Sequence, residues 1–478
     1  MAWETVIGLE VHTQLKTQSK LFSASATTFG ASPNEQASVI DLGLPGVLPT
    51  FNQQALHLAI RFGLGINASI NDKSIFERKN YFYPDLPKGY QITQFEHPIV
   101  IGGHIDIKMA DHTEKRIRVT RAHLEEDAGK STHDGLVGET SVDFNRAGIP
   151  LLEIVSEPDL RSAEEAVTYL KTLHQLVRYL DICDGNMEQG SFRCDVNLSM
   201  RQQGDNTLGT RTEMKNLNSF RFIEQAILYE RDRQIDLLES GKKIRQETRL
   251  YDPNKNITKT MRVKEDSDDY RYFPDPDLLP VIVNTTMIDN IKTTVPELPA
   301  TKKQRYMEEL QLSADDTDKL ISHLNTANYF EHTLQYMTQP NPQMAANWIN
   351  GELSALLNRE KTHIADCPIK PDRLAGLLSA IQDGSISNTI GREVQNHMWQ
   401  HPETATDIIQ QQGLTQISDN ASLEPIINDI ISKFPQQAAD FRAGKDKLFA
   451  FFVGQVMKQT KGKANPQQVN QLLKEKLK

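Results

Sequence analysis

Short apolar runs, many of them alternating with polar residues, fill the chain up to about residue 290, with glycine and proline between them. Runs such as Val39-Ile40 and Ile99-Val100-Ile101 are typical of strands. Two helices are predicted among them, one with Ser162 as its N-cap and one at about 220–240 that ends at Gly241. This part of the chain is therefore predicted to be α+β.

Beyond the stretch from Leu278 to Pro299, β-branched runs become rare and helical patterns take over. The periodic segments predict helices at 300–311, 315–338, 343–358, 371–382, 385–398, 425–431, 445–460 and 466–477. At 478 residues, the chain is too long for one hydrophobic core. We therefore predict three domains, at 1–293, 294–410 and 411–478.

The composition is that of an ordinary soluble globular protein, with 38% hydrophobic and 24% charged residues. No apolar run approaches the roughly 18–20 residues that a membrane helix needs, and the first residues show no signal-peptide pattern. The three cysteines, Cys183, Cys194 and Cys367, lie far apart and form no CxxC pair. These features predict a cytoplasmic protein that has no structural zinc and does not contact a membrane.

Charge is unevenly distributed along the chain. The net charge is −10, yet the last 38 residues contain nine basic and two acidic residues. A basic terminal segment on an acidic protein indicates contact with a polyanion such as RNA. The alternative is a solvated, charged helix face, which is equally common.

Two carboxylates lie inside short apolar runs that are predicted to be buried strands. Glu10 is part of Val6-Ile7-Gly8-Leu9-Glu10-Val11-His12, and Glu153 is part of Pro150-Leu151-Leu152-Glu153-Ile154-Val155. Residues two apart on a strand share one face at a spacing of about 7 Å, so Glu10 and His12 are close enough to share an ion. A buried carboxylate needs a cation, a metal or several donors. A wet sheet face or a strand-to-strand ion pair remains the alternative.

A third polar stretch, Glu125-Glu126-Asp127-Ala128-Gly129-Lys130, follows a predicted strand around Ile117. Three adjacent acids beside a Gly-Lys pair resemble a hard-cation site near a phosphate group, although acid-rich loops are usually only solvated. The chain has no phosphate-binding loop, dinucleotide fingerprint, zinc-peptidase motif or nucleophile elbow. Any nucleotide would therefore be bound through carboxylate-held magnesium and scattered basic residues.

Several longer runs carry a family resemblance. They are Glu4-Thr-Val-Ile-Gly-Leu-Glu-Val-His12, Arg78-Lys-Asn-Tyr-Phe-Tyr-Pro-Asp85, Glu125-Glu-Asp-Ala-Gly-Lys-Ser131, Asp143-Phe-Asn-Arg-Ala-Gly-Ile-Pro-Leu-Leu-Glu153, Gly190-Ser-Phe-Arg-Cys-Asp-Val-Asn197, Glu213-Met-Lys-Asn-Leu-Asn-Ser-Phe220, Ser267-Asp-Asp-Tyr-Arg-Tyr-Phe-Pro274 and Phe452-Val-Gly-Gln-Val-Met457. In this order the chain resembles, nearly end to end, the B subunits of the aspartyl/glutamyl-tRNA amidotransferases, the GatB family.

The resemblance implies a fold and a reaction. The fold is α+β, with a mixed β-sheet N-terminal catalytic domain of cradle-like shape, an all-α connector and a small all-α tail domain that binds tRNA. The family uses ATP to phosphorylate the side-chain carboxylate of Glu on tRNA-Gln or Asp on tRNA-Asn, and ammonia then displaces phosphate to form the amide. The chain would thus be part of an ATP-dependent carbon–nitrogen ligase with glutamine as the amido donor. It lacks the catalytic run of an amidase, so ammonia would come from a partner glutaminase of the amidase type, and a small third subunit would complete a heterotrimer.

Site residues follow from the same resemblance. The metal and catalytic group would comprise Glu10, His12, Glu153 and either Glu125 or Glu126, with Glu126 preferred, and it would hold Mg²⁺ or Mn²⁺. Nucleotide or substrate contacts are predicted for Lys79, Tyr81, Lys88, Arg146, Lys215 and Asn216. Contacts with tRNA are predicted for Arg442, Lys445, Lys447, Lys458, Lys461 and Lys463.

Two other functions remain open at this level. The chain would be a non-catalytic tRNA-binding scaffold if all the chemistry took place in its partner. It would be a metal-dependent phosphohydrolase if it cleaved simple phosphate esters without tRNA. The choice between Glu-tRNA-Gln, Asp-tRNA-Asn or both as substrate is also open.

Overall fold

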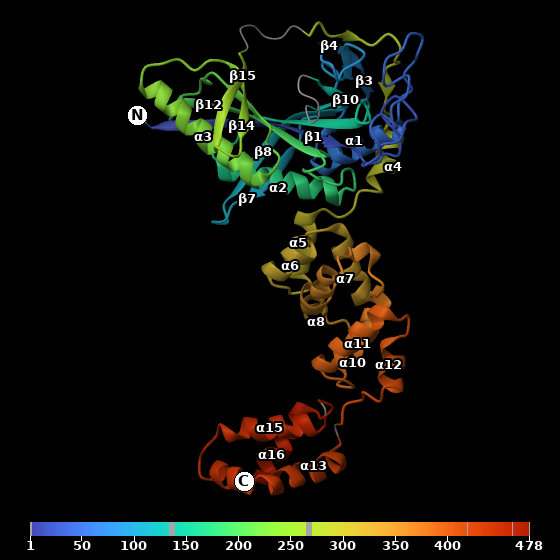
Figure 1. The fold of residues 1–478 in the computed structure, drawn as a ribbon, viewed down its shortest axis with the longest axis vertical. Helices are drawn as coiled ribbons and strands as arrows, with labels where there is room; N and C mark the ends of the chain where they lie inside the picture. Colours follow the sequence, from blue (N-terminus) through green and yellow to red (C-terminus); the bar gives the residue numbers. More distant parts are fainter. Residues whose placement is uncertain (1, 133–138, 264–269, 418, 461, 478) are drawn as a thin grey trace. The chain divides into compact units, whose positions relative to one another are not determined.

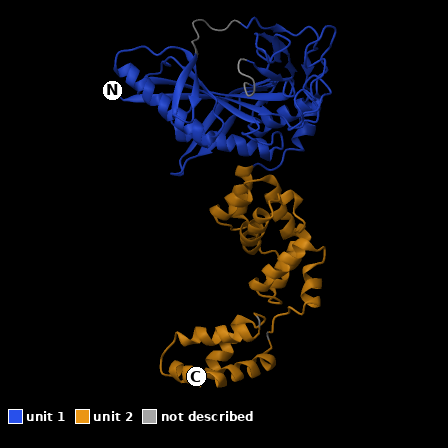
Figure 2. Ribbon diagram, viewed as in Figure 1, with its two compact units in different colours: residues 1–298 blue, residues 299–478 orange. Residues whose placement is uncertain are grey.

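The computed structural model describes residues 2–132, 139–263, 270–417, 419–460 and 462–477. The chain forms two compact units, Met1–Leu298 and Pro299–Lys478 (Figure 2). The predicted first boundary, after residue 293, lies close to the end of the first unit. The division of the rest into 294–410 and 411–478 stays a prediction. Each unit is described by itself.

A ten-stranded mixed sheet organises the first unit (Figure 1). Its main path runs β15 (Ile257–Val263), β14 (Glu247–Asp252), β13 (Thr212–Lys215), β12 (Phe192–Gln202), β1 (Trp3–Gln14), β11 (Pro150–Ser156), β8 (Glu114–Glu126), β6 (Val100–Ile101) and β2 (Ser69–Ile70), and β7 (His104–Lys108) pairs with β8. All neighbours are antiparallel except β13 and β14. The central strand β1 thus brings together β11 and β12, which are distant from it in sequence.

The two faces of this sheet differ in chemistry. Ile7, Leu9 and Val11 of β1 are buried in the core of the unit. Three helices contribute to the same core: α1 (Gln53–Gly65), α2 (Ala163–Tyr179) and α3 (Phe220–Glu239). Because strand side chains alternate, Glu10 and His12 point to the opposite face. The helices therefore cover the apolar face and leave the polar face for chemistry.

Local signals place α2 and α3 as predicted. The Ser162 hydroxyl accepts a hydrogen bond from the Glu165 amide at the start of α2. Gly241 follows α3 with φ of +74°, which a residue without a side chain adopts at no steric cost. The prediction of only two helices in this part was wrong, because α1 and α4 (Thr285–Lys292) are also present. Helix α1 was missed although Gln54, His57 and Arg61 recur at helical spacing on its partly exposed side.

Three smaller sheets complete the first unit. They are β16 (Phe273–Pro274) with β4 (Glu77–Asn80) and β5 (Tyr90–Thr93), β17 (Val281–Ile282) with β3 (Lys73–Ser74), and β10 (Ser141–Asp143) with β9 (Lys130–Thr132). The predicted strand at Val39-Ile40 is wrong: these residues form a turn, and Val39 is exposed. The polar stretch from Glu125 was predicted to follow its strand, but β8 runs on through Glu126.

The second unit is helical. Its elements are α5 (Pro299–Glu308), α6 (Ala314–Leu320), α7 (Leu324–Tyr336), α8 (Pro342–Trp348), η1 (Ile349–Leu353), α9 (Ser354–Arg359), η2 (Ile364–Asp366), α10 (Pro371–Gln382), α11 (Asn388–Gln400), α12 (Ala405–Gln411), α13 (Asn420–Lys433), α14 (Pro435–Arg442), α15 (Leu448–Gln459) and α16 (Pro466–Leu477). The single helix predicted at 315–338 is two helices, α6 and α7, and neither α12 nor α14 was predicted. This unit has two separate hydrophobic cores, one between Tyr306 and Ile409 and one between Leu423 and Leu477. The expected mixed-sheet domain followed by helices is confirmed.

Among the described residues, no helix combines the length and the apolar character that crossing a bilayer requires.

Candidate metal centre

Strand register collects the polar side chains on one face of the central strands. His12 is directly opposite Glu153 of β11 and Arg193 of β12, while Glu10 is opposite Asp195. Glu153 in turn is opposite His123 of β8. Residues opposite each other, or two apart on one strand, share a face. The face therefore carries Glu10, His12, His123, Glu125, Glu153, Arg193, Asp195, Asn197, Glu213 and Lys215.

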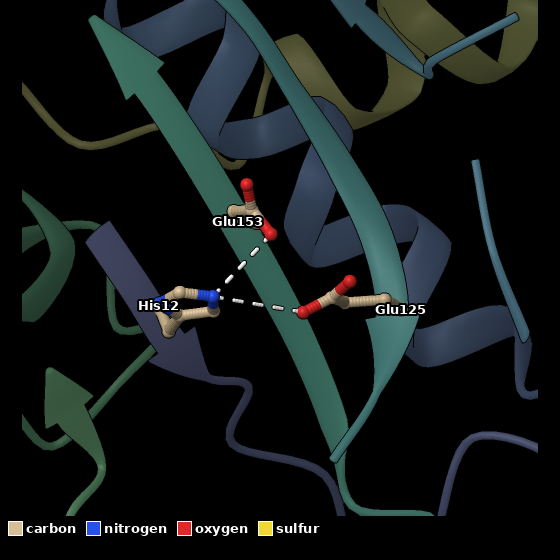
Figure 3. A group of neighbouring side chains, drawn as sticks. All are labelled: His12, Glu125 and Glu153. Atoms are coloured by element: carbon tan, nitrogen blue, oxygen red, sulfur yellow. Dashed lines mark ion pairs between the residues drawn. The ribbon is translucent and has the colours of Figure 1, made fainter. Parts of the chain in front are cut away.

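A first group on this face consists of His12, Glu125 and Glu153, one from each of three adjacent strands (Figure 3). His12 Nε2 lies 3.3 Å from Glu153 Oε2 and 3.8 Å from Glu125 Oε1. Glu125 is buried and also accepts a hydrogen bond of 3.2 Å from Thr93 Oγ1. One ligand atom from each member lies within 4.8 Å of the others. One imidazole and two carboxylates so placed can hold a divalent cation.

The charges of the first group stabilise each other. Burial alone would lower the pKa of His12, but the hydrogen bond to Glu153 and the charges of Glu153 and Glu125 outweigh it and raise this pKa to about 9. Burial would raise the pKa of Glu153, yet the charges of His123, His12 and Lys79 hold this pKa well below its usual range. A positive charge, from protons or from a metal, is therefore strongly favoured between these carboxylates.

A second group, Glu10, Asp195 and Glu213, lies on the same face and offers only carboxylate oxygens. Asn197 Nδ2 donates to Glu10 Oε1 at 3.0 Å, and Lys215 Nζ lies 2.5 Å from Asp195 Oδ2. Burial, followed by the charges of Glu153, Glu213 and Asp195, raises the pKa of Glu10. Like charges opposite each other on neighbouring strands destabilise a sheet, so this group gains from bound cations. Oxygen-only ligands suit Mg²⁺.

The predicted metal-binding residues are thus divided between two groups. Glu10 and His12 were expected to share one ion, but the structure places them in different, neighbouring groups. Glu10 and Glu153 are diagonal neighbours on paired strands, since Glu10 is opposite Val155. Such neighbours have Cβ atoms about 7 Å apart. The two strands therefore contribute to adjacent parts of one face.

The three adjacent acids at 125–127 do not form one site. Glu125 joins the first group, whereas Glu126 pairs with Lys88 and accepts a 2.9 Å hydrogen bond from the Ile92 amide. Asp127 forms a bidentate ion pair of 3.0 and 3.1 Å with Arg193. Successive strand residues point to opposite faces, which separates Glu126 from Glu125. The preference for Glu126 over Glu125 is therefore not supported by position.

Two of the residues predicted to contact the nucleotide or substrate, Lys79 and Tyr81, lie in a cluster of aromatic rings. The Lys79 ammonium lies 5.0 Å from the centre of the Tyr270 ring and 5.7 Å from that of Tyr81, and the charges of Glu125 and Glu153 help raise its pKa against the effect of burial. Tyr81 Oη donates to Gln91 at 3.3 Å. Lys79 and Lys215 are thus the predicted cations nearest to the two groups.

Three further residues that were predicted to contact the nucleotide or substrate form bonds to other residues of the protein. Arg146 donates to the carbonyl oxygens of Ala128 at 2.9 Å and Gly129 at 2.6 Å. Asn216 has φ of +66° and donates to the Tyr251 carbonyl at 3.1 Å. Lys88 pairs with Glu126, away from the first group. Their predicted nucleotide contacts stay predictions.

Basic residues of the tail differ in their environment. Arg442 donates to the Leu477 carbonyl at 3.2 Å, Lys445 pairs with Asp440 at 3.0 Å, and Lys463 donates to the Gly413 carbonyl at 2.7 Å. Lys447 and Lys458 are exposed and have no ion-pair partner in the described part of the chain. Lys461 lies outside the described residues. Lys447 and Lys458 are therefore best placed to meet an external anion.

Sequence reasoning missed Asp195, Glu213 and His123 as members of the polar face. Asp195 stands between apolar residues in Cys194-Asp195-Val196, the same pattern that singled out Glu10. Glu213 precedes Met214 in a strand of only four residues, too short to show alternation. A systematic search for acids inside apolar runs would have found Asp195.

A cavity of about 190 Å³ opens beside the second group. Its lining includes Glu10 and Asn197 and extends to Gly8, Ser156, Ser199, Leu208, Gly209 and Arg211. Gly8 has no atom closer than 3.8 Å to the position of a Cβ, which leaves room above the strand. The cavity offers an apolar wall, hydroxyls and one guanidinium next to the Glu10 carboxylate.

Comparisons with known proteins agree on one family. Residues 5–289 match the model of the GatB/GatE catalytic domain, and residues 328–477 match that of the GatB domain. The chain is 58% identical to the B subunit of the aspartyl/glutamyl-tRNA(Asn/Gln) amidotransferase from Coxiella burnetii, with 100% of both chains covered. It is 56% identical to the protein of the same name from Nitrosococcus oceani, again over 100% of both chains. The corresponding protein of Halorhodospira halophila is 54% identical over 100% of this chain and 99% of its own. The chain therefore belongs to the GatB family, the B subunits of the aspartyl/glutamyl-tRNA(Asn/Gln) amidotransferases.

Proposed function

We propose that this chain is the carboxylate-activating subunit of an ATP-dependent tRNA amidotransferase. It would transfer the γ-phosphoryl group of ATP to the side-chain carboxylate of Glu on tRNA-Gln, Asp on tRNA-Asn, or both. Ammonia would then attack the acyl phosphate and release inorganic phosphate, forming the amide. A carboxylate is a poor electrophile, and phosphorylation gives it a good leaving group.

One observation carries this proposal: two groups of metal-ligating side chains lie next to each other on the polar face of the sheet. Phosphoryl transfer needs positioning and charge neutralisation more than covalent help from the protein. Bound divalent cations, Mg²⁺ or Mn²⁺, would supply this neutralisation at the phosphate oxygens. Glu10, Asp195 and Glu213 would hold one, and His12, Glu125 and Glu153 the other.

A lysine and a cavity next to the two groups would also contribute to binding. Lys79, next to Glu125 and Glu153, is charged and would attract the acidic substrate or a phosphate group. The cavity beside Glu10 and Asn197 would receive part of the nucleotide. The partners of this chain would be a glutaminase of the amidase type, a small third subunit, and misacylated tRNA.

An oxygen-transfer experiment tests the proposed reaction. Misacylated tRNA whose amino acid carries ¹⁸O in the side-chain carboxylate is incubated with ATP, glutamine and the heterotrimer. Formation of an acyl phosphate moves one labelled oxygen into the released phosphate. Phosphate without label would contradict carboxylate activation, and amidation unaffected by variants of this face would favour the scaffold function.

Glu10→Gln is expected to raise the KM for ATP·Mg²⁺ at least about tenfold while changing kcat less. The substitution removes one of the three carboxylates of the second group and leaves Asn197 with a weaker acceptor. Steady-state kinetics of the heterotrimer with varied ATP measure the effect. The exposed Glu188→Gln is the matched control. An unchanged KM would mean that the second group does not serve the nucleotide.

The double variant Lys447→Gln/Lys458→Gln is expected to weaken tRNA binding and to reduce the salt dependence of that binding. Loss of two phosphate contacts lowers the slope of log K against log salt by about 1.5. Binding isotherms of the full chain at several salt concentrations measure this slope. Lys242→Gln/Lys243→Gln, an exposed pair after α3, is the matched control. An equal slope in both variants would count against tRNA contact by these two lysines.

A further inference from the structure

An arginine on the polar face has no counter-charge in the described part of the chain. Arg121 lies on β8 and is partly buried, and its terminal nitrogens Nη1 and Nη2 form neither a hydrogen bond nor an ion pair there. Two other arginines of the same strand behave in the opposite way. Arg116 and Arg118 are 61% and 65% exposed, yet they pair with Asp106 at 2.8 Å and with Asp159 at 2.7 Å. Charged groups that are withdrawn from water normally have a partner, so the lone guanidinium is the unexpected one.

A β-bulge turns Arg121 to the polar face. Val119 of β8 is buried in the core, and strict alternation would place Arg121 on that apolar face as well. The register shifts here, because Ser156 of β11 is opposite Val119 while the preceding Val155 is opposite Arg121. Ala122 then enters the core in place of Arg121. Bulges are common beside active sites, where they redirect a side chain.

An aromatic stack positions the guanidinium beside the first group. The rings of Phe95 and Tyr272 are nearly parallel, with centroids 4.3 Å apart, and Arg121 Cζ lies 5.5 Å from the centre of the Phe95 ring. Burial raises the pKa of the Tyr272 hydroxyl, Lys79 opposes this effect, and the two carboxylates of the first group add to it. The stack therefore lies within electrostatic reach of that group. A ring face stabilises a cation but leaves its N–H donors at Nη1 and Nη2 unused.

The carboxylates of the first group do not neutralise Arg121. Glu125 and Glu153 form their ion pairs with His12 and His123, and none reaches Arg121 among the described residues. The first group is thus bordered by a guanidinium whose fork has no anion. Two parallel N–H groups match the two oxygens of a phosphate or a carboxylate.

We propose that Nη1 and Nη2 of Arg121 bind an oxyanion of the reactants, either a phosphate of the nucleotide or the side-chain carboxylate of the misacylated amino acid. Both are oxygen pairs of negative charge, and both must approach the first group during activation of the carboxylate. An arginine at the transferred phosphoryl group commonly shares its charge with the bound metal ions. The identity of the anion rests on the proposed function, but the binding of an anion does not.

Equilibrium binding to the heterotrimer tests this role without turnover. Arg121→Gln is expected to lose at least about tenfold in affinity for one of two probes, the non-hydrolysable ATP analogue AMP-PNP with Mg²⁺ or misacylated tRNA. A loss confined to AMP-PNP assigns the phosphate. A loss confined to misacylated tRNA assigns the carboxylate. Uncharged tRNA should bind unchanged in either case, and Arg116→Gln, on the same strand, is the matched control.

Chemical rescue separates anion binding from a structural role. In Arg121→Ala, added guanidinium ion at millimolar concentration should restore part of the lost affinity, and Arg121→Lys should retain part of it because the charge stays but the fork is lost. Unchanged affinity of Arg121→Gln for both probes would overturn the proposal. Loss of affinity for uncharged tRNA as well, without rescue by guanidinium, would also overturn it. A rescued loss in a protein that transfers no ¹⁸O would leave the anion site standing and contradict the proposed function instead.

Discussion

Glu153→Gln is expected to reduce ATP-dependent amidation by the heterotrimer about a thousandfold. Glu153 Oε2 lies 3.3 Å from His12 Nε2 and 3.6 Å from His123 Nε2, so this carboxylate contacts an imidazole on each of its two neighbouring strands. A catalytic metal supplies several kcal/mol of charge stabilisation, and about 1.4 kcal/mol corresponds to tenfold in rate. Glutamine keeps the shape of the side chain but removes its charge. Rates of ATP cleavage and of amide formation are the measurements.

The matched control is Glu157→Gln. Glu157 follows β11, accepts a hydrogen bond from Thr120 at 2.8 Å and belongs to neither group. Both variants should assemble with their partner proteins, as judged by size-exclusion chromatography. Normal amidation by an assembled Glu153→Gln complex would refute a catalytic centre here and leave the tRNA-binding scaffold as the better description.

Glu230→Gln is expected to lower the free energy of unfolding of the first unit by about 3 to 5 kcal/mol. Glu230 is fully buried in α3, where it pairs with Arg233 at 2.6 Å and with Arg249 at 3.3 Å. The Thr212 and Thr258 hydroxyls donate to the same carboxylate at 2.9 and 3.0 Å. The neutral amide removes one of the two carboxylates, Glu230 and Glu247, that neutralise Arg233 and Arg249. Urea unfolding, followed for the transition of this unit, measures the loss.

The effect should depend on pH in a defined direction. Burial would raise the pKa of Glu230, but the hydrogen bonds and charges of Arg233 and Arg249 outweigh it and lower this pKa. A carboxylate whose pKa is lower in the folded state stabilises the protein fully above its unfolded pKa of about 4.3. The difference between wild type and variant should be constant from neutral pH to about pH 5 and shrink as pH falls further.

Glu224→Gln, at an exposed position of the same helix, should unfold as the wild type does. A difference between wild type and Glu230→Gln that grew on acidification would contradict the assigned direction of the pKa shift. Equal stability of Glu230→Gln and Glu224→Gln at neutral pH would show that the buried ion pairs contribute nothing to folding.

Local sequence signals predicted those features that depend on neighbours along the chain. Ser162 predicted the start of α2 because a hydroxyl at that position accepts from the first turn of its own helix. Gly241 predicted the end of α3 because a residue without a side chain adopts its φ of +74° at no steric cost. Helix α1 has local signals of the same kind, since Asn52 accepts a hydrogen bond from the Gln54 amide and the polar residues Gln54, His57 and Arg61 recur at helical spacing, but these signals were missed.

The candidate site was predicted less completely than the fold. Glu10, His12 and Glu153 were identified because a carboxylate or imidazole inside an apolar strand needs a partner. The sequence did not show which partner each one has. Nothing in the sequence distinguished Glu125 from Glu126 as a partner of His12. The sequence also did not predict that Glu10 and His12 belong to different groups.

By itself, the sequence determined the family, the change from strands to helices after about residue 290 and the acidic residues that lie on strands. Only the tertiary structure decided which of those acids lie close to one another. Strand β1 lies between β11 and β12, whose residues are more than 130 positions away from it in sequence, and the register of these pairs sets His12 opposite Glu153 and Glu10 opposite Asp195. A shift of the pairing register by one residue would turn every side chain of a strand to the other face. The alternation along a strand therefore shows which residues share a face, but not which residues of the neighbouring strands lie opposite them. Those partners follow from non-local pairing, and they separate one row of polar side chains into two groups, one with His12, Glu125 and Glu153 and one with Glu10, Asp195 and Glu213.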